Sequence, residues 1–427
     1  MLLPLRTTQQ SCHTEYSNAE PPSNLGLRNG LLAQSSGVDL RRRCLRSSVT
    51  SGTLRAAICL PNPSSRSDDV MRRIPQFMPP PVALLSLATA SPPNVLAQAQ
   101  VEQAARDLFY DKFPQFERMA PVFTSAGVRT RQVIRPIEWY FEPRGWPERT
   151  EAYLDGATDL FVQAASAALA EAGLAGPDVD VIVTVSSTGI ATPSLEARAM
   201  ERMKFRPDAA RVPVFGLGCA GGATGLALAA KLAAATPGAI VLFVTVELCS
   251  LAFRLDNLSK ADIVATALFG DGAAACVVRA GEGGFAQVTG IAEHTWPATL
   301  DVMGWRVEPT GLGVIFARAI PPFAKTNLRP AMASMLGGQN LEVEDIDRFI
   351  CHPGGVKVIE ALELSLSIPQ GGLDREREVL ADHGNMSAPT ALFVLDRVRR
   401  SGMPPRSVLT ALGPGFTAST VTLDRAA

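Results

Sequence analysis

Apolar and polar residues recur along most of the chain with periods that predict amphipathic helices and buried strands. Apolar residues from Val101 to Phe109 have the three- and four-residue spacing of a helix. A second helix is predicted from about Thr150 to Ala172, where Gly173 supplies a C-cap. Continuous apolar runs such as "AIVLFVTV" predict strands that are covered on both faces. This alternation of helices and strands indicates the α/β class.

The pattern occurs twice. "GPDVDVIVTVSSTG" matches "VEDIDRFICHPGG", because each places Asp-apolar-Asp before an apolar strand. "GCAGGATGLAL" matches "GNMSAPTALFV", with a threonine five positions after Cys219 and after Asn385. Matching halves predict a duplicated α/β fold with buried sheets and central helices. We expect the first half to span residues 79–290 and the second residues 291–427.

Residues 1–78 lack this pattern. They contain ten arginines, no lysine and five acidic residues among many serines. Such a composition occurs in transit peptides, but also in disordered tails and in sequences whose true start lies later, here at Met71 or Met78. We expect a disordered or mis-called extension that carries no catalytic residue.

Composition and charge exclude several classes of function. The net charge of −1 gives no argument for binding nucleic acid or an anionic membrane. No apolar run approaches the ~18 residues of a membrane span. The seven cysteines show no metal-ligand spacing, and no secretory signal is evident. We therefore expect a cytoplasmic protein with reduced thiols and no metal.

Cys219, in "GLGCAGG", is the candidate nucleophile. It lies on a glycine-rich turn where an alanine-rich helix begins. A helix N-terminus and a nearby imidazolium favour thiolate, and such settings lower a thiol pKa from ~8.5 to ~3.5–7.5. Gly218, Gly221 and Gly222 let the backbone approach a ligand closely. A packed structural cysteine is the alternative for this residue type, but these surroundings favour a nucleophile.

His352 and Asn385 are the predicted partners of this nucleophile. His352 ends a second-half strand, and Asn385 occupies the position that matches the cysteine. The other histidines suit the site less well: His13 in the extension, His294 without a glycine turn, and His383, which we expect beside the site. Papain-like proteases also use Cys, His and Asn, but their C-G-[SA]-C-[WY] segment is missing here.

Five segments, "GLGCAGG", "ALFGDGAAACVV", "FICHPGG", "GNMSAPT" and "LGPG", resemble the successive motifs of type III polyketide synthases, the chalcone and stilbene synthase family. The resemblance runs from about Pro80 to Leu423. It implies the thiolase-type αβαβα layered fold and a homodimer. It also implies CoA thioesters as substrates, with no metal, no other cofactor and no carrier protein.

The resemblance also implies the roles of the site residues. Cys219 attacks a starter acyl-CoA as a thiolate stabilised by His352. His352 and Asn385 then donate hydrogen bonds to the thioester oxygen of malonyl-CoA while it loses carbon dioxide, and the enolate attacks the acyl-cysteine. Phe269, in "ALFGDG", corresponds to an aromatic gatekeeper beside them. Repeated extension precedes cyclisation.

Four further residues are candidate pocket residues. Cys249 and Ala252 resemble positions that are threonines in plant enzymes, and Trp305 resembles a phenylalanine position. Thr188 is predicted on a strand-end turn that faces the same cavity. Small side chains at 249 and 252 favour an apolar starter, unless they are ordinary packing residues. The pattern is most similar to bacterial long-chain alkylpyrone and alkylresorcinol synthases.

The expected function is therefore an acyltransferase that condenses a medium- or long-chain fatty acyl-CoA with malonyl-CoA and cyclises the product. Arg118 matches a basic position that contacts CoA phosphates in relatives, although its basic neighbour is replaced by Val122. An initiating ketoacyl-acyl-carrier-protein synthase uses the same three residues on the same fold and stays an alternative. A catalytically silent scaffold relative is another.

Overall fold

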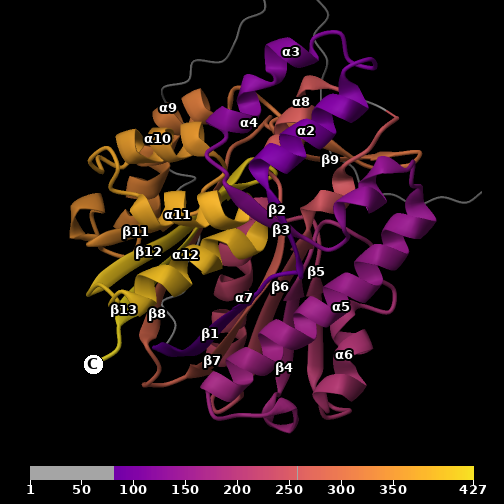
Figure 1. Cartoon of the computed structure of the whole chain (residues 1–427). Helices are drawn as coiled ribbons and strands as arrows, with labels where there is room; N and C mark the ends of the chain where they lie inside the picture. Colours follow the sequence, from indigo (N-terminus) through magenta and orange to yellow (C-terminus); the bar gives the residue numbers. More distant parts are fainter. Residues whose placement is uncertain (1–80, 257) are drawn as a thin grey trace, which may run out of the picture. The chain divides into compact units, whose positions relative to one another are not determined.

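A nine-stranded sheet runs through the molecule in the order β11-β12-β13-β8-β1-β7-β6-β4-β5 (Figure 1). The computed structural model describes residues 81–256 and 258–427, so the predicted extension at residues 1–78 lies outside the described residues. The sheet strands are β1 (Val82–Ala90), β4 (Val181–Val185), β5 (Ala210–Val214), β6 (Val241–Leu248), β7 (Asp271–Ala280), β8 (Ala286–Thr295), β11 (Arg348–Cys351), β12 (Arg406–Gly413) and β13 (Thr417–Arg425).

The strand order shows the predicted duplication. β4, β6 and β7 correspond to β11, β12 and β13, and the two sets lie on opposite sides of the β1–β8 pair. In each half one strand pair within the repeat is parallel, β4 with β6 and β11 with β12. The pairs that follow, β6 with β7 and β12 with β13, are antiparallel. The sheet is therefore mixed, with one arrangement used twice.

The repeated Asp-apolar-Asp motif has a structural cause. The first aspartate of each copy, Asp178 or Asp345, accepts the backbone N–H three residues before it, at 2.8 and 2.7 Å. The second, Asp180 or Asp347, accepts the N–H that leads into the neighbouring strand, at 2.8 Å in both halves. Each carboxylate satisfies a backbone donor that would otherwise lack a partner at the strand entrance.

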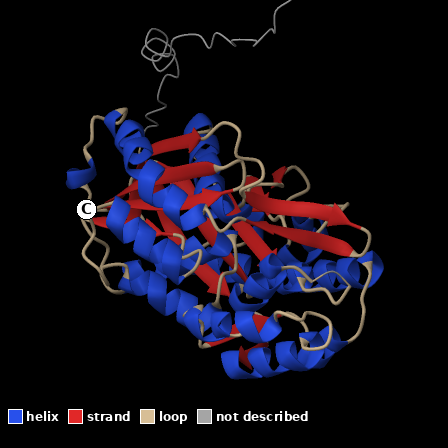
Figure 2. Ribbon diagram, turned by 90° about the horizontal axis from the view of Figure 1, so that it is seen from above, coloured by secondary structure: helices blue, strands red, loops and turns tan. Residues whose placement is uncertain are grey.

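Helices cover the sheet in layers, which gives the αβαβα arrangement (Figures 1 and 2). α7 and α12 lie between the two halves of the sheet, whereas α5 and α6 pack on the first half and α9 packs on the second with α10 against it. The helices are α2 (Gln98–Phe109), α3 (Phe116–Met119), α4 (Pro121–Ser125), α5 (Trp146–Glu171), α6 (Leu195–Met203), α7 (Gly221–Ala235), α8 (Lys260–Leu268), α9 (Ile320–Gly337), α10 (Val356–Ser365), α11 (Asp374–His383) and α12 (Ala388–Arg400). The two helices predicted from periodicity are confirmed as α2 and α5.

α7 and α12 touch through their backbones. A Cβ at Gly222 would lie 2.3 Å from the carbonyl oxygen of Ala388, so only glycine allows this approach. By length and composition the helical segment Gly218–Ala235 could cross a membrane, but it is the buried central helix of the fold. Its apolar composition therefore reflects core packing.

The remaining elements cover the ends of the first-half strands. They include two small antiparallel pairs, β2 (Asn94–Ala97) with β3 (Thr130–Val133) and β9 (Met303–Glu308) with β10 (Gly311–Phe316). Five 3₁₀ turns complete the part of the chain that the structure describes: η1 (Ile137–Phe141), η2 (Gly176–Asp178), η3 (Gly218–Ala220), η4 (Cys249–Ala252) and η5 (Val343–Asp345).

Candidate active site

Cys219 lies on η3, two residues before Gly221, the first residue of α7. The turn requires glycine before it, because Gly218 has a φ of +48° and a Cβ there would lie 2.7 Å from Pro414. The thiol is 8% exposed and forms a side-chain hydrogen bond with Ser387. The sequence prediction of a cysteine on a tight turn at a helix start is confirmed.

His352 directly follows β11, the second-half strand that corresponds to β4 in the first half. Its backbone N–H donates to the Thr410 carbonyl at 2.9 Å, which extends the pairing of β11 with β12 by one residue. The side chain is buried, and neither ring nitrogen has a hydrogen-bond partner among the described residues. The imidazole is thus free to bind a substrate atom.

Asn385 is fully buried just before α12, and hydrogen bonds fix its amide orientation. Its Oδ1 accepts the Ser387 N–H at 2.8 Å, and its Nδ2 lies 3.4 Å from the Gly354 carbonyl. Because the oxygen is already occupied, the NH₂ group is the part of the amide that faces other partners. Asn385 is therefore arranged as a donor.

The three residues line one narrow pocket, together with apolar side chains that include Met303 and Phe316. The structure thus brings Cys219, His352 and Asn385 together from three separate turns. Two N–H donors beside a thiol form the arrangement that stabilises an oxyanion during acyl transfer. Groups of three or more metal-ligating side chains do not occur among the described residues.

Burial opposes charge on both members of the Cys–His pair. Burial, with a smaller contribution from Glu247, raises the pKa of the Cys219 thiol to about 12, and burial lowers the pKa of the His352 imidazole to about 4. The expected lowering of the thiol pKa is therefore not seen. Transfer of the thiol proton to His352 creates two opposite charges, whose attraction acts with the helix N-terminus against that desolvation.

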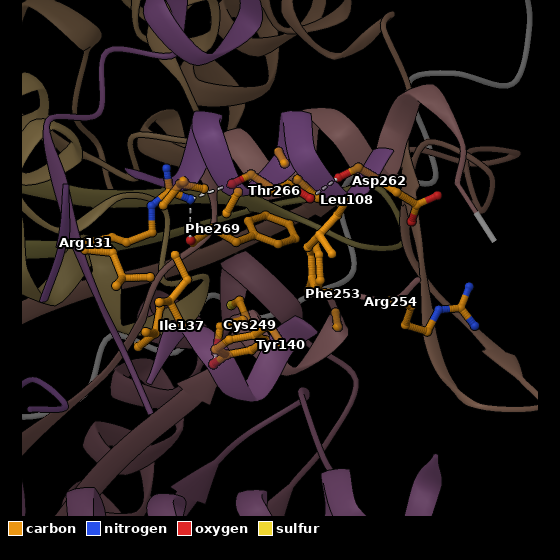
Figure 3. Close-up of a pocket in the computed structure, with 18 of the residues that line it drawn as sticks. Leu108, Arg131, Ile137, Tyr140, Cys249, Phe253, Arg254, Asp262, Thr266 and Phe269 are labelled. Atoms are coloured by element: carbon orange, nitrogen blue, oxygen red, sulfur yellow. Dashed lines mark hydrogen bonds between the residues drawn. The ribbon is translucent and has the colours of Figure 1, made fainter. Parts of the chain in front are cut away.

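A second, largely apolar cavity lies beyond Phe269 (Figure 3). Phe269 forms an isolated backbone bridge with Asn385, and its ring meets Trp305 edge-on at 6.1 Å between centroids. Both Cys249 and Ala252, on η4, line this cavity. Phe269 therefore stands between the narrow pocket and the apolar cavity, with Trp305 against it.

Thr188 and Arg118 do not line the narrow pocket or the apolar cavity. The Thr188 hydroxyl donates to Glu247 at 2.7 Å and accepts the Leu248 N–H at 2.8 Å, and this residue is not among those that line the two cavities. Arg118 is exposed on α3, directly before Met119, which lines a third cavity. The expected contacts of Thr188 and Arg118 with substrate therefore stay predictions.

Several residues of the site were not expected from the sequence. A cavity of about 740 Å³ shares Phe316 and Gly354 with the narrow pocket and is lined by three exposed cations, Lys260, Arg318 and Lys357. Each cation comes from a different segment, so no local sequence motif predicts that they lie together. Only one sequence feature points to buried Glu247: it is a carboxylate at the end of the apolar run "AIVLFVTVE".

Among the described residues, the two other histidines lie outside the narrow pocket, as expected. His383 pairs through Nδ1 with Gln132 at 2.7 Å, and Arg397 lies 3.4 Å from its Nε2. His294 packs edge-on against Trp296. Both have structural contacts that account for them.

A duplicated αβαβα fold with a buried cysteine, histidine and asparagine beside a cation-lined cavity defines a thiolase-fold condensing acyltransferase. Models of the chalcone and stilbene synthases match this chain at residues 73–282 for the N-terminal domain and 287–426 for the C-terminal domain. The chain belongs to the chalcone and stilbene synthase family. Its members are type III polyketide synthases, which act on CoA thioesters without a further cofactor.

Two relatives and one solved structure illustrate the similarity. A 1,3,6,8-tetrahydroxynaphthalene synthase of Streptomyces peucetius subsp. caesius is 39% identical, with 80% of this chain and 92% of the relative covered. A putative chalcone synthase of Bacillus subtilis is 36% identical over 78% of this chain and 96% of its own. The crystal structure of the Streptomyces coelicolor 1,3,6,8-tetrahydroxynaphthalene synthase matches with a TM-score of 0.77 at 29% identity, covering 81% of this chain and 99% of that one. Membership of this family decides against the carrier-protein-dependent alternative.

Proposed function

We propose that this type III polyketide synthase loads a medium- or long-chain fatty acyl group onto Cys219 and extends it with malonyl-CoA. Decarboxylative Claisen condensation then lengthens the chain, which cyclises to an alkylpyrone or alkylresorcinol. The single observation that carries the starter class is the apolar cavity behind Phe269, lined by Cys249 and Ala252. A chain attached at Cys219 has this cavity as its apolar route away from the nucleophile.

Most polar groups in the wall of this cavity are already engaged by the protein. The Arg131 guanidinium donates to the carbonyls of Thr266 and Phe269, at 2.7 and 2.9 Å. The Tyr140 hydroxyl is bonded to Ser250 at 2.7 Å, and the Ser250 hydroxyl donates to a buried aspartate. The wall therefore offers mainly apolar surface to a ligand, which suits an alkyl chain better than a poly-β-keto chain.

Coenzyme A enters, in this proposal, through the larger cavity. Lys260, Arg318 and Lys357 are suited to its phosphates, because exposed cations bind phosphate oxygens through charge-assisted hydrogen bonds. Phe316 and Gly354 belong to the walls of this cavity and of the Cys219 pocket. The thioester thus has a path from the cations to the nucleophile.

The reaction then follows from the geometry of the narrow pocket. His352 accepts the thiol proton, and Cys219 attacks the starter thioester and releases free CoA. The thioester oxygen of malonyl-CoA next accepts hydrogen bonds from His352 and from Asn385 Nδ2. Loss of carbon dioxide builds negative charge on that oxygen, where one preorganised donor is worth ~10²–10³ in rate. The resulting enolate attacks the acyl-cysteine carbonyl and displaces the Cys219 thiolate, which leaves the extended chain on CoA.

A second candidate is supported by the relatives named for 1,3,6,8-tetrahydroxynaphthalene. That ring system carries no alkyl chain and can be assembled from malonyl units alone. Product analysis separates the two candidates. We expect alkylated pyrones or resorcinols from fatty acyl-CoA starters of graded length, whereas tetrahydroxynaphthalene from malonyl-CoA alone, with no alkylated product, would refute the fatty-acyl proposal.

We also propose that the enzyme acts as a homodimer in the cytoplasm. Ile190 and Phe215 are 56% and 62% exposed, and Phe215 follows the edge strand β5. Two large apolar side chains close to a free sheet edge are suited to a subunit contact. Size-exclusion chromatography with light scattering should give twice the chain mass, and Phe215→Asp should shift the population toward monomer.

A further inference from the structure

β11 carries the residue before the catalytic histidine, and among the described strands it is an edge strand that pairs only with β12. Backbone N–H groups on the free side of an edge strand need partners from elsewhere. The Cys351 N–H donates to Glu376 Oε1 at 2.9 Å, and Glu376 is completely buried. Its Oε2 accepts from Arg348 Nη2 at 2.6 Å, so one carboxylate holds both ends of the short strand.

His352 depends on such backbone contacts for its position. Neither ring nitrogen has a partner among the described residues, so no side-chain hydrogen bond orients the imidazole. The backbone is fixed by the His352 N–H on Thr410 at 2.9 Å and by the Gly354 N–H on the His352 carbonyl at 3.0 Å. The contact of Cys351 with Glu376 lies on the opposite side of the strand. It holds the residue directly before the histidine.

Glu376 also belongs to the segment that carries Asn385. It lies in the first turn of α11, which ends at His383 and leads through Gly384 into Asn385. The glycine has a φ of +68°, and a Cβ there would lie 2.6 Å from the Leu268 carbonyl, so this connection is tightly defined. Glu376 therefore joins the histidine strand to the asparagine segment.

We propose that Glu376 is a positioning residue that sets the spacing between the His352 and Asn385 donors. This inference rests on the proposed roles of those two donors in malonyl decarboxylation. Both must reach one thioester oxygen, and a misplacement of about 1 Å at such a site can lower the rate roughly 100-fold. Acylation of Cys219 does not need both donors to converge in the same way. Loss of Glu376 is therefore expected to affect decarboxylation more than starter loading.

Burying the Glu376 carboxylate costs free energy. A side chain that served only to fill space would not need a carboxylate. Burial raises the pKa of Glu376 to about 7, and the Arg348 guanidinium acts in the opposite direction. Well-packed apolar residues often replace a buried ion pair without loss of stability. An apolar residue could fill the space, but it could not accept the Cys351 N–H.

The experiment compares Glu376→Ala and Glu376→Gln in the full chain with a matched control. Glu363 is the control because it is also a buried carboxylate, paired with Arg377 and bonded to two backbone N–H groups, but among the described residues it forms no hydrogen bond with β11. The readouts are kcat and KM for decarboxylation of malonyl-CoA without a starter, the rate of Cys219 acylation by a starter acyl-CoA, and Tm.

Glu376→Ala should lower the decarboxylation kcat roughly 10- to 100-fold, with KM and the acylation rate changed less than about threefold. Glu376→Gln should recover much of the loss, because its Oε1 still accepts the Cys351 N–H. Glu363→Ala should lower Tm, but it should not lower the decarboxylation kcat more than the acylation rate. Equal losses of decarboxylation and acylation in both alanine variants, or full decarboxylation in Glu376→Ala, would overturn the proposal. If Asn385→Ala itself decarboxylates normally, the proposed donor roles fail instead.

Discussion

Substitution of Ala252 by phenylalanine tests whether the apolar cavity holds the starter chain. Ala252 lines the cavity and is only 8% exposed, so a larger side chain there must occupy space inside it. Each buried methylene contributes about 0.8 kcal/mol. If the ring displaces about four methylenes, long starters lose about 3 kcal/mol, which corresponds to roughly 150-fold in kcat/KM. Short acyl starters should lose less than about threefold.

The assay measures kcat/KM for acyl-CoA starters of graded chain length, with starter-free malonyl decarboxylation as an internal reference. Ala104→Phe is a matched control, because Ala104 lines the same cavity from α2 but is partly exposed. Ala104→Phe should lower kcat/KM only for the longest starters. If Ala252→Phe lowers kcat/KM equally for short and long starters, or for neither, Ala252 does not line the acyl route. The fatty-acyl proposal then loses its main support.

Three further predictions concern the catalytic residues and their surroundings. Asn385→Ala should lose starter-free malonyl decarboxylation by roughly 10²–10³ yet still acylate Cys219, whereas His352→Ala should impair both; normal decarboxylation in the asparagine variant would disprove the oxyanion role. His352→Gln should raise the pH at which iodoacetamide alkylates Cys219, because burial alone raises the thiol pKa; an unchanged pH profile of alkylation rates would show that no ion pair forms. Burial, with a contribution from Arg397, lowers the pKa of His383 to about 4, so the unfolded chain binds a proton that the folded chain does not between about pH 6.5 and 4. The free energy of unfolding should therefore fall across that window by about 2 kcal/mol more than in His383→Gln, as measured by urea unfolding at pH 7 and 4.5.

The duplication and the three central residues could be predicted from the sequence because their signals are local. A pair of aspartates that satisfies backbone donors at a strand entrance recurs at Asp178 and Asp345. A nucleophile on a turn at a helix start needs glycine at a fixed offset, as at Gly218 before Cys219. Such short-range requirements produce similar sequence patterns in the two halves. Asn385 is predicted because it occupies the position that matches Cys219.

Contacts between distant segments could not be predicted in the same way. Lys260, Arg318 and Lys357 meet at one cavity only because α8, α10 and the segment before α9 converge there. The role of Thr188 depends on Glu247, a strand-end residue that lies opposite it only in the folded sheet. The pKa of Cys219 is likewise set by burial, which no sequence motif encodes.

Intact-protein mass spectrometry can measure whether Cys219 accepts a fatty acyl group from CoA. The full chain would be incubated with a long-chain acyl-CoA in the absence of malonyl-CoA, and the modified peptide would then be identified. We expect one acyl group per chain, attached to Cys219, and none in Cys219→Ala. An acyl group on Cys249 or Cys351 in a fully active enzyme, or no fatty acylation at all, would contradict this expectation.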